Sequence, residues 1–193
     1  GKTLVLLHAL ARAGRQQAAE LDLEPTRKTV LLTYTTTLVK YDRYLAEVMG
    51  AAGAEKQVQT ADSFFLARLK AIDPRYWVDY DVMKKLSQEL NSTDFLSSEE
   101  LATEIEQLLF GNEITRKEYV DENLSRRGMR QPLSTAQRAR VWDTKEAMVA
   151  RMEESGGLSK NFSRIKIVEH LQRANAAGPG ENGVDYIFLD ESQ

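Results

Sequence analysis

Hydrophobic residues near the start of the chain recur at two periods, one typical of helices and one of strands. Leu4, Leu7 and Leu10 lie three residues apart, a spacing that predicts the apolar face of a helix over residues 3–17. The stretch "TVLLTYTT" at residues 29–36 is short, β-branched and mostly apolar, as buried parallel strands are. The sequence therefore predicts a helix followed by a buried strand.

The same alternation continues beyond this strand. A second helix is predicted over residues 38–49, and the stretch "GAAGA" ends it. The short "QVQT" at residues 57–60 predicts a second strand, and "ADSFFLARLK" begins another helix directly after it. The apolar face of the second helix is expected to consist of Leu38, Tyr41, Leu45 and Val48.

From Pro74 onward the pattern becomes helical, and no convincing strand is predicted until the end of the chain. Two capping boxes mark helix starts: Ser97 with Glu100, and Ser134 with the glutamine three residues later. The final apolar run, "VDYIFLD" at residues 184–190, predicts a third strand. The sequence thus predicts an α/β fold interrupted by a large all-helical insertion.

Composition narrows the class of protein without identifying a function. Hydrophobic residues make up 42% of the 193 residues and charged residues 28%, which is typical of a globular chain. There is no cysteine, which excludes disulfides, thiolate catalysis and cysteine-ligated zinc. No apolar run approaches the roughly 18 residues of a membrane span, and no signal peptide is visible, so we expect a cytoplasmic protein without membrane contacts. The net charge of −3 argues weakly against nucleic-acid binding.

The tripeptide Gly1-Lys2-Thr3 stands where the first predicted helix begins. In a phosphate-binding loop, backbone N–H groups at a helix start surround the phosphates. Lysine then contacts the β- and γ-phosphates, and threonine binds Mg²⁺. Considered alone, the tripeptide is explained more simply as an ordinary helix start.

Asp190-Glu191-Ser192-Gln193 directly follows the third predicted strand. Parallel α/β sheets place their ligand chemistry at the carboxyl ends of strands. An aspartate there can hold Mg²⁺, and a neighbouring glutamate can orient or deprotonate the attacking water. Alone, such an acidic pair is usually a solvated strand end. Together with the opening tripeptide, it supplies the two halves of an ATP site in the expected order.

These motifs resemble those of the UvrD/Rep-like helicases of superfamily 1A, which include the helicase half of RecB-type nucleases. Gly1-Lys2-Thr3 matches the end of the family's Walker A motif, and "LLTYTTTLVKY" is similar to motif Ia. "QTADSFFLARL" resembles motif Ib, and "IFLDESQ" resembles motif II, the Asp-Glu-x-Gln box, whose last residue is Gln193. Asp62 stands where many relatives have histidine, which places a carboxylate near the expected DNA path. Ser192 replaces a more common alanine or phenylalanine.

The resemblance implies a partial RecA-like P-loop NTPase sheet with an inserted helical subdomain of the 1B type. The ATP-binding domain would comprise residues 1–72 and 183–193, and the insertion residues 73–182. ATP and Mg²⁺ are the implied cofactors. The implied roles are phosphate binding by Gly1, Lys2 and Thr3, Mg²⁺ coordination by Thr3 and Asp190, and catalysis by Glu191 and Gln193.

The resemblance also implies an ATP-dependent helicase or translocase that moves on single-stranded DNA. Tyr34 is the aromatic residue expected to stack on a base. The basic stretch "RRGMR" at residues 126–130, with Arg138 and Arg140, either contacts phosphates at a duplex junction or forms a solvated loop and helix face. The implied DNA-binding residues are Thr33, Tyr34, Thr35, Thr36, Thr60, Asp62 and Ser63.

Because the chain starts within the Walker A motif and without an initiator methionine, we interpret it as part of a longer helicase chain. Alone, it is expected to have negligible ATPase activity. Three alternatives stay open. They are a related ATPase acting on RNA or in a nuclease or defence complex, a non-catalytic interaction module with a relic ATP site, and an unrelated helical protein.

Overall fold

The structure is a computed structural model. It describes residues 2–19, 29–49, 57–122, 124–126, 132–176, 184 and 186–190. Within these ranges, the side chains of residues 2, 13–19 and 174–176 are not described.

The chain is a mostly helical α/β protein with a small parallel sheet, and it divides into two compact units. The first unit comprises Gly1–Ala67 and Gln172–Gln193. The second unit is Arg68–Leu171.

Both boundaries between the units fall inside helices. One lies in α3 (Ala61–Ile72) and the other in α7 (Lys160–Ala176). The sequence places the boundaries after residues 72 and 182, at breaks in the helical pattern. A helix that continues from one unit into the next leaves no loop signal at the boundary itself.

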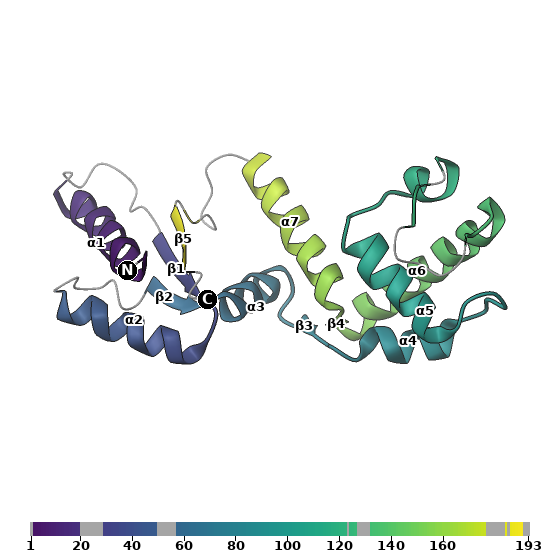
Figure 1. Ribbon diagram of the computed structural model, residues 1–193, viewed down its shortest axis with the longest axis horizontal. Coiled ribbons are helices and arrows are strands. Elements are labelled where there is room, and N and C mark those ends of the chain that lie inside the picture. The colour runs from purple at the N-terminus through teal and green to yellow at the C-terminus, as the bar shows by residue number, and fades with distance from the viewer. Residues whose placement is uncertain are drawn as a thin grey trace. The chain divides into compact units, whose positions relative to one another are not determined.

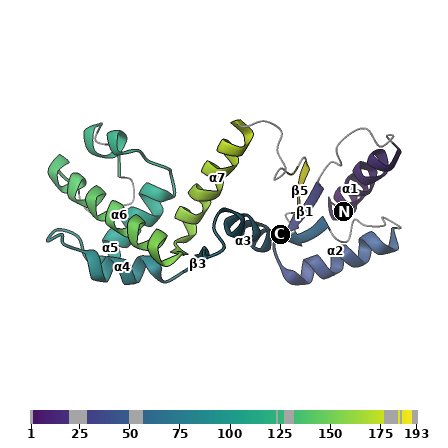
Figure 2. The ribbon, with the colours of Figure 1, turned by 180° about the vertical axis from the view of Figure 1, so that it is seen from behind.

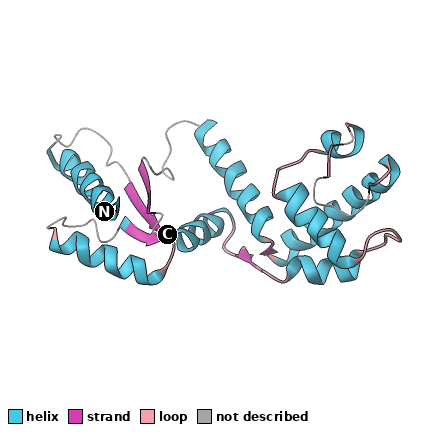
Figure 3. Cartoon of the chain, viewed as in Figure 1, coloured by secondary structure: helices cyan, strands magenta, loops and turns pink. Residues whose placement is uncertain are grey.

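Three parallel strands form the sheet of the first unit, in the order β2-β1-β5. β1 spans Thr29–Thr33, β2 spans Val58–Thr60 and β5 spans Tyr186–Asp190. All three coincide with predicted strands and are drawn in magenta in Figure 3. The central strand, β1, is buried along its whole length, which explains its β-branched and apolar composition. It ends earlier than predicted, because Thr35 already caps the following helix.

Two helices cover one side of this sheet, α1 (Lys2–Ala19) and α2 (Thr36–Val48). Figures 1 and 2 show α1 beside the strands and α2 below them, and both helices share one core with the sheet. α1 buries its predicted face except for Leu4, which is exposed. The buried members of the core between helices and sheet are Leu7, Leu10, Ala11, Leu31, Val39, Ala46 and Val58.

The apolar face predicted for α2 is wrong at two of its four positions. Tyr41 and Val48 are 54% and 64% exposed. The face that packs inward instead carries Val39, Asp42 and Ala46. The helix is therefore rotated so that Tyr41 and Val48 lie outside and an aspartate lies inside, while Leu45 still packs against the edge of the core.

Polar contacts at two places hold α2 in this rotation. Thr35 Oγ1 accepts the N–H of Leu38 at 3.2 Å and so starts the helix. The guanidinium of Arg43 donates to the carbonyl oxygen of Val58 on β2, at 2.9 Å from Nη2 and 3.2 Å from Nε. Ala46, which is completely buried, gives the inward face of the helix a small side chain.

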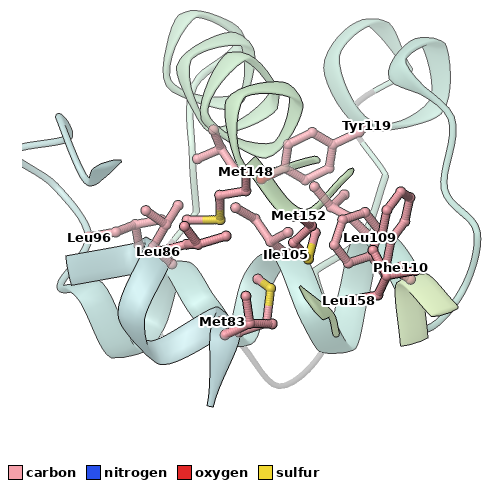
Figure 4. Packing of buried hydrophobic residues seen from close by; sticks show 14 of the residues in the cluster. Met83, Leu86, Leu96, Ile105, Leu109, Phe110, Tyr119, Met148, Met152 and Leu158 are labelled. Atoms are coloured by element: carbon pink, nitrogen blue, oxygen red, sulfur yellow. The ribbon is translucent and has the colours of Figure 1, made fainter. Parts of the chain in front are cut away.

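Helices make up most of the second unit (Figure 3). Both predicted capping boxes are present, at Ser97 with Glu100 and at Ser134 with Gln137. One core joins the elements, and Figure 4 shows Met148 packed among other buried side chains of this core. The helices are α4 (Val82–Leu90), α5 (Ser98–Thr103), the π-helices η2 (Glu104–Phe110) and η3 (Lys117–Asp121), and α6 (Thr135–Ser155), joined by the first part of α7.

The expectation that the insertion contains no strand is wrong in one detail. β3 (Trp77–Val78) and β4 (Gly157–Leu158) form a two-stranded parallel pair. Two residues are too few for a period-two pattern to register in the sequence. Entry into β4 depends on Gly156, which ends α6 with a φ of 81°, and a Cβ at that position would lie 2.6 Å from the carbonyl oxygen of Arg75.

Candidate functional site

The carboxyl ends of the three strands of the first unit's sheet bring Thr33, Thr60 and Asp190 into one row. Thr33 on the central strand is paired with Thr60 on β2 and with Asp190 on β5. Paired residues of neighbouring strands point to the same face. Leu31, two residues before Thr33, belongs to the core shared with α1 and α2. The row therefore faces these two helices, at the edge where parallel α/β sheets hold their ligands.

α1 begins at this edge and brings Thr3 to the row. Thr3 Oγ1 donates a hydrogen bond of 2.8 Å to Oδ2 of Asp190, joining residues 187 positions apart. The Asp190 side chain is nearly buried, with 5% exposure. The two residues assigned to Mg²⁺ from the sequence are therefore direct neighbours.

Of the other residues assigned to the ATP site, only the backbone of Lys2 is described. Lys2 is the first residue of α1, so its N–H lies at the positive end of the helix dipole, where anions are stabilised. Gly1, Glu191 and Gln193 lie outside the described residues, as does Ser192. Their roles stay predictions.

A second carboxylate, not singled out from the sequence, lies near the first. Asp42 on α2 is completely buried, and neither of its carboxylate oxygens has a hydrogen-bond partner among the described residues. Burial, followed by the negative charge of Asp190, raises the pKa of Asp42 to about 6. Thr33, which is 2% exposed, likewise has no partner for Oγ1 within the described part of the chain.

The sequence contained one signal for Asp42. Val39, Asp42 and Ala46 follow the spacing of a helix face, so an aspartate stands at a position where an apolar residue is expected. The competing face, with Tyr41 and Val48, carries larger apolar side chains and therefore dominated the pattern.

The residues predicted to bind DNA differ in their exposure. Tyr34 is 85% exposed just after the end of β1. Thr36, Asp62 and Ser63 are also exposed. Thr33 is buried, so its side chain does not reach the surface.

Two threonines of this set bond to the starts of helices. Thr35 caps α2 through its hydrogen bond with the N–H of Leu38. Thr60 Oγ1 accepts the N–H of Ser63 at 3.1 Å and donates to the Ser63 hydroxyl at 2.7 Å. These bonds hold the two turns that lead from the strand ends into α2 and α3.

The first arginine of the predicted basic stretch is buried in an ion pair. The Arg126 side chain is 5% exposed and donates to both carboxylate oxygens of Glu104, at 2.5 and 2.6 Å. Tyr119 also donates to Glu104, at 2.6 Å. Burial would lower the pKa of Arg126, but the hydrogen bond and charge of Glu104 raise it overall. Arg126 therefore serves the packing of the second unit and is not available to a phosphate.

Arg138 and Arg140, both on α6, also have protein partners. Arg138 is 4% exposed and donates to the carbonyl oxygens of Tyr119 and Leu124, at 2.9 and 3.0 Å. Arg140 donates to a carboxylate oxygen of Asp94 at 3.0 Å. The prediction of a solvated helix face is wrong for Arg138. Because the side chain is buried, it also cannot contact the phosphates of a duplex. The arginines at positions 127 and 130 lie outside the described residues.

The donors at the Thr3–Asp190 contact are hydroxyl and carboxylate oxygens, which suit a hard cation such as Mg²⁺. Among the described residues, no group of three or more histidines, aspartates or glutamates is arranged to hold a metal. A cation at Thr3 and Asp190 would therefore take further oxygen ligands from water or phosphate, as Mg²⁺ commonly does in nucleotide sites.

Comparison with known proteins adds no family assignment. No protein-family model matches the chain, and no match was found among curated proteins. Within the described residues, every helix is too short or too polar to cross a bilayer. The class that the structure establishes is an α/β protein with a small parallel sheet.

Proposed function

We propose that the first unit is the magnesium–nucleotide-binding part of an ATPase with a RecA-like fold. More particularly, we propose that it belongs to the motor of a UvrD/Rep-like superfamily 1A DNA helicase, which couples ATP hydrolysis to movement on single-stranded DNA. The observation that supports this best is the hydrogen bond between Thr3 and Asp190.

This hydrogen bond supports the proposal because of the two elements that it joins. Thr3 follows a lysine at the start of a helix, and Asp190 is the last residue of a parallel strand. In a nucleotide site of this kind, a helix start and an acidic strand end must meet around the same Mg²⁺. A chain with an unrelated function has no such reason to bring residues of these types together across 187 positions.

The proposed roles are those that the family resemblance implies, and each suits the chemistry of its side chain. Lys2 neutralises the β- and γ-phosphates, and Thr3 and Asp190 hold Mg²⁺, which screens the phosphate charge when it is bound. Glu191 positions the hydrolytic water. Gln193 contacts the γ-phosphate and couples its presence to the DNA contacts.

Single-stranded DNA would be bound beside the same strand ends. Tyr34 offers an exposed ring on which a base can stack, next to the row that contains Asp190. Thr36 and Ser63 present exposed hydroxyl groups to the phosphate backbone. Because the strand ends connect both sets of residues, nucleotide and DNA contacts can influence each other.

The nucleotide site is tested by removing one hydroxyl group. In the full-length protein, Thr3→Val keeps the shape of the side chain but removes the bond to Asp190 and a Mg²⁺ ligand. We expect the Kd for a fluorescent ATP analogue in the presence of Mg²⁺ to rise at least tenfold, measured by fluorescence titration. Thr37→Val, at an exposed position on α2, is the matched control and should leave the Kd unchanged. Equal Kd values for both variants and the parent would contradict the ATPase proposal and favour a relic site.

The nucleic-acid contact is tested at Tyr34. Tyr34→Ala is expected to weaken binding of single-stranded oligonucleotides about 5- to 150-fold, because stacking on an aromatic ring contributes roughly 1–3 kcal/mol per base. Fluorescence anisotropy with labelled DNA and RNA of the same sequence measures the effect.

Tyr80, which is 76% exposed in the second unit, supplies the matched control through Tyr80→Ala. If Tyr34→Ala leaves DNA affinity unchanged, the stacking role is wrong. If the parent protein binds and is stimulated by RNA only, the related RNA-dependent ATPase replaces the DNA helicase as the function.

A further inference from the structure

We propose that Asp42 is the second carboxylate of a divalent-cation site formed with Thr3 and Asp190. The inference rests on the proposed function, and it adds a residue to which that function assigns no role. It starts from the buried and unpartnered carboxylate of Asp42. Such a group is rare, because buried polar groups in folded proteins are almost always hydrogen-bonded.

Within the described part of the chain, no hydrogen bond offsets the free-energy cost of burying the Asp42 carboxylate. Its side chain is 0% exposed, and neither oxygen has a hydrogen-bond partner there. The neighbouring arginine, Arg43, is committed to the carbonyl oxygen of Val58. An unpaired buried carboxylate lowers the free energy of unfolding, and a bound cation is one of the few arrangements that offset this loss.

The fold places this carboxylate on the side of the sheet where Asp190 lies. α2 packs against α1, β1 and β2, and Asp42 is on the face of α2 that points inward. Asp190 is close enough for its charge to act on Asp42. Thr33, paired with Asp190 in the sheet, adds a buried hydroxyl group that also lacks a partner among the described residues.

The proposed site would draw on two carboxylates and two hydroxyl groups. Carboxylates that share a site repel each other, and a divalent cation between them converts that repulsion into attraction. Oxygen donors of this kind select Mg²⁺ or Mn²⁺ rather than a soft metal. Asp42 would act on the cation directly or through one of the water molecules that Mg²⁺ keeps.

Mn²⁺ binding to the full-length protein without nucleotide tests this role. Free Mn²⁺ is followed by electron paramagnetic resonance at pH 7.5. Asp42→Asn, which keeps the size of the side chain, is expected to raise the Kd for Mn²⁺ at least tenfold. Asp190→Asn should abolish binding. Glu47→Gln, at an exposed position of the same helix, is the matched control and should leave the Kd unchanged.

The outcomes separate this inference from the proposed function. If Asp190→Asn loses Mn²⁺ while Asp42→Asn binds it as the parent does, Asp42 is not part of the site and the ATPase proposal stands. If the parent binds no Mn²⁺, the inference is wrong, and the nucleotide titration of Thr3→Val still decides the function. Asp42→Ser serves as a second variant, with circular dichroism as the check on folding. A tenfold loss in either folded variant supports the role of Asp42.

Discussion

Replacement of Glu104 by glutamine is expected to lower the free energy of unfolding of the second unit by about 3–5 kcal/mol, because it leaves a buried charge without its partner. Glu104 is 0% exposed, and the side chain of Arg126, bonded to it twice, is 5% exposed. Tyr119 completes the group, and burial with the adjacent carboxylate raises the pKa of its hydroxyl, which therefore stays protonated as a donor. Glutamine keeps the shape but cannot neutralise the guanidinium.

Tryptophan fluorescence during urea unfolding measures this effect for the second unit alone. The chain has two tryptophans, Trp77 and Trp142, and both belong to Arg68–Leu171. The ring of Trp142 also lies 6.3 Å from that of Tyr119, so it reports on the same region of the core.

The exposed ion pair between Lys117 and Glu122 provides the control for Glu104. Their atoms are 3.1 Å apart, and the side chains are 77% and 53% exposed. Glu122→Gln should change stability by less than about 0.5 kcal/mol, since exposed pairs contribute little. If the two glutamine variants unfold at the same urea concentration, the buried pair does not stabilise the unit.

Replacement of Asp42 by asparagine is expected to act in the opposite direction and to stabilise the first unit in the absence of divalent cations. The gap between the ordinary pKa of 3.8 and the pKa of about 6 in the folded protein corresponds to about 3 kcal/mol at neutral pH. Asparagine has no charge to bury, so most of this destabilisation should disappear.

The dependence on pH has a definite sign. Because the pKa of Asp42 is raised, the folded protein binds more protons than the unfolded chain between about pH 4 and pH 6. The stability of the parent therefore falls as pH rises through this interval, and the penalty is complete above it. The advantage of Asp42→Asn should be largest at pH 7.5 and vanish near pH 4.

Urea unfolding in EDTA, followed by far-UV circular dichroism, tests the Asp42 prediction. Tryptophan fluorescence identifies the transition of the second unit, so the remaining signal belongs to the first. Glu47→Gln, exposed on the same helix, should match the parent at every pH. An advantage of Asp42→Asn that stays constant from pH 4 to pH 7.5 would assign the effect to packing rather than to charge.

The strands and helix starts were predictable because their signals are local. β1 is buried along its whole length and is therefore a mostly apolar run in the sequence. The capping boxes at Ser97 and Ser134 indicate where two helices begin. β3 and β4 left no signal, since two residues carry no periodicity. The rotation of α2 was also missed. The rotation is accompanied by the hydrogen bond from Arg43 to the carbonyl oxygen of Val58. This contact joins two elements, and the pattern of hydrophobic residues along the chain does not predict it.

The sequence by itself determined the order of the elements and the residue types at both sides of the candidate site, including Thr3 and Asp190. Only the tertiary structure decided that these two residues meet, because strand order and helix placement join positions 187 residues apart. It also decided that Arg126 is buried against Glu104 and that Asp42 lies inside. Charge and hydrophobicity are properties of single residues, whereas burial and pairing depend on which elements pack together. For this reason the sequence could not show that an arginine predicted at a basic surface forms a core ion pair. It could not show either that a second carboxylate lies buried near the candidate site.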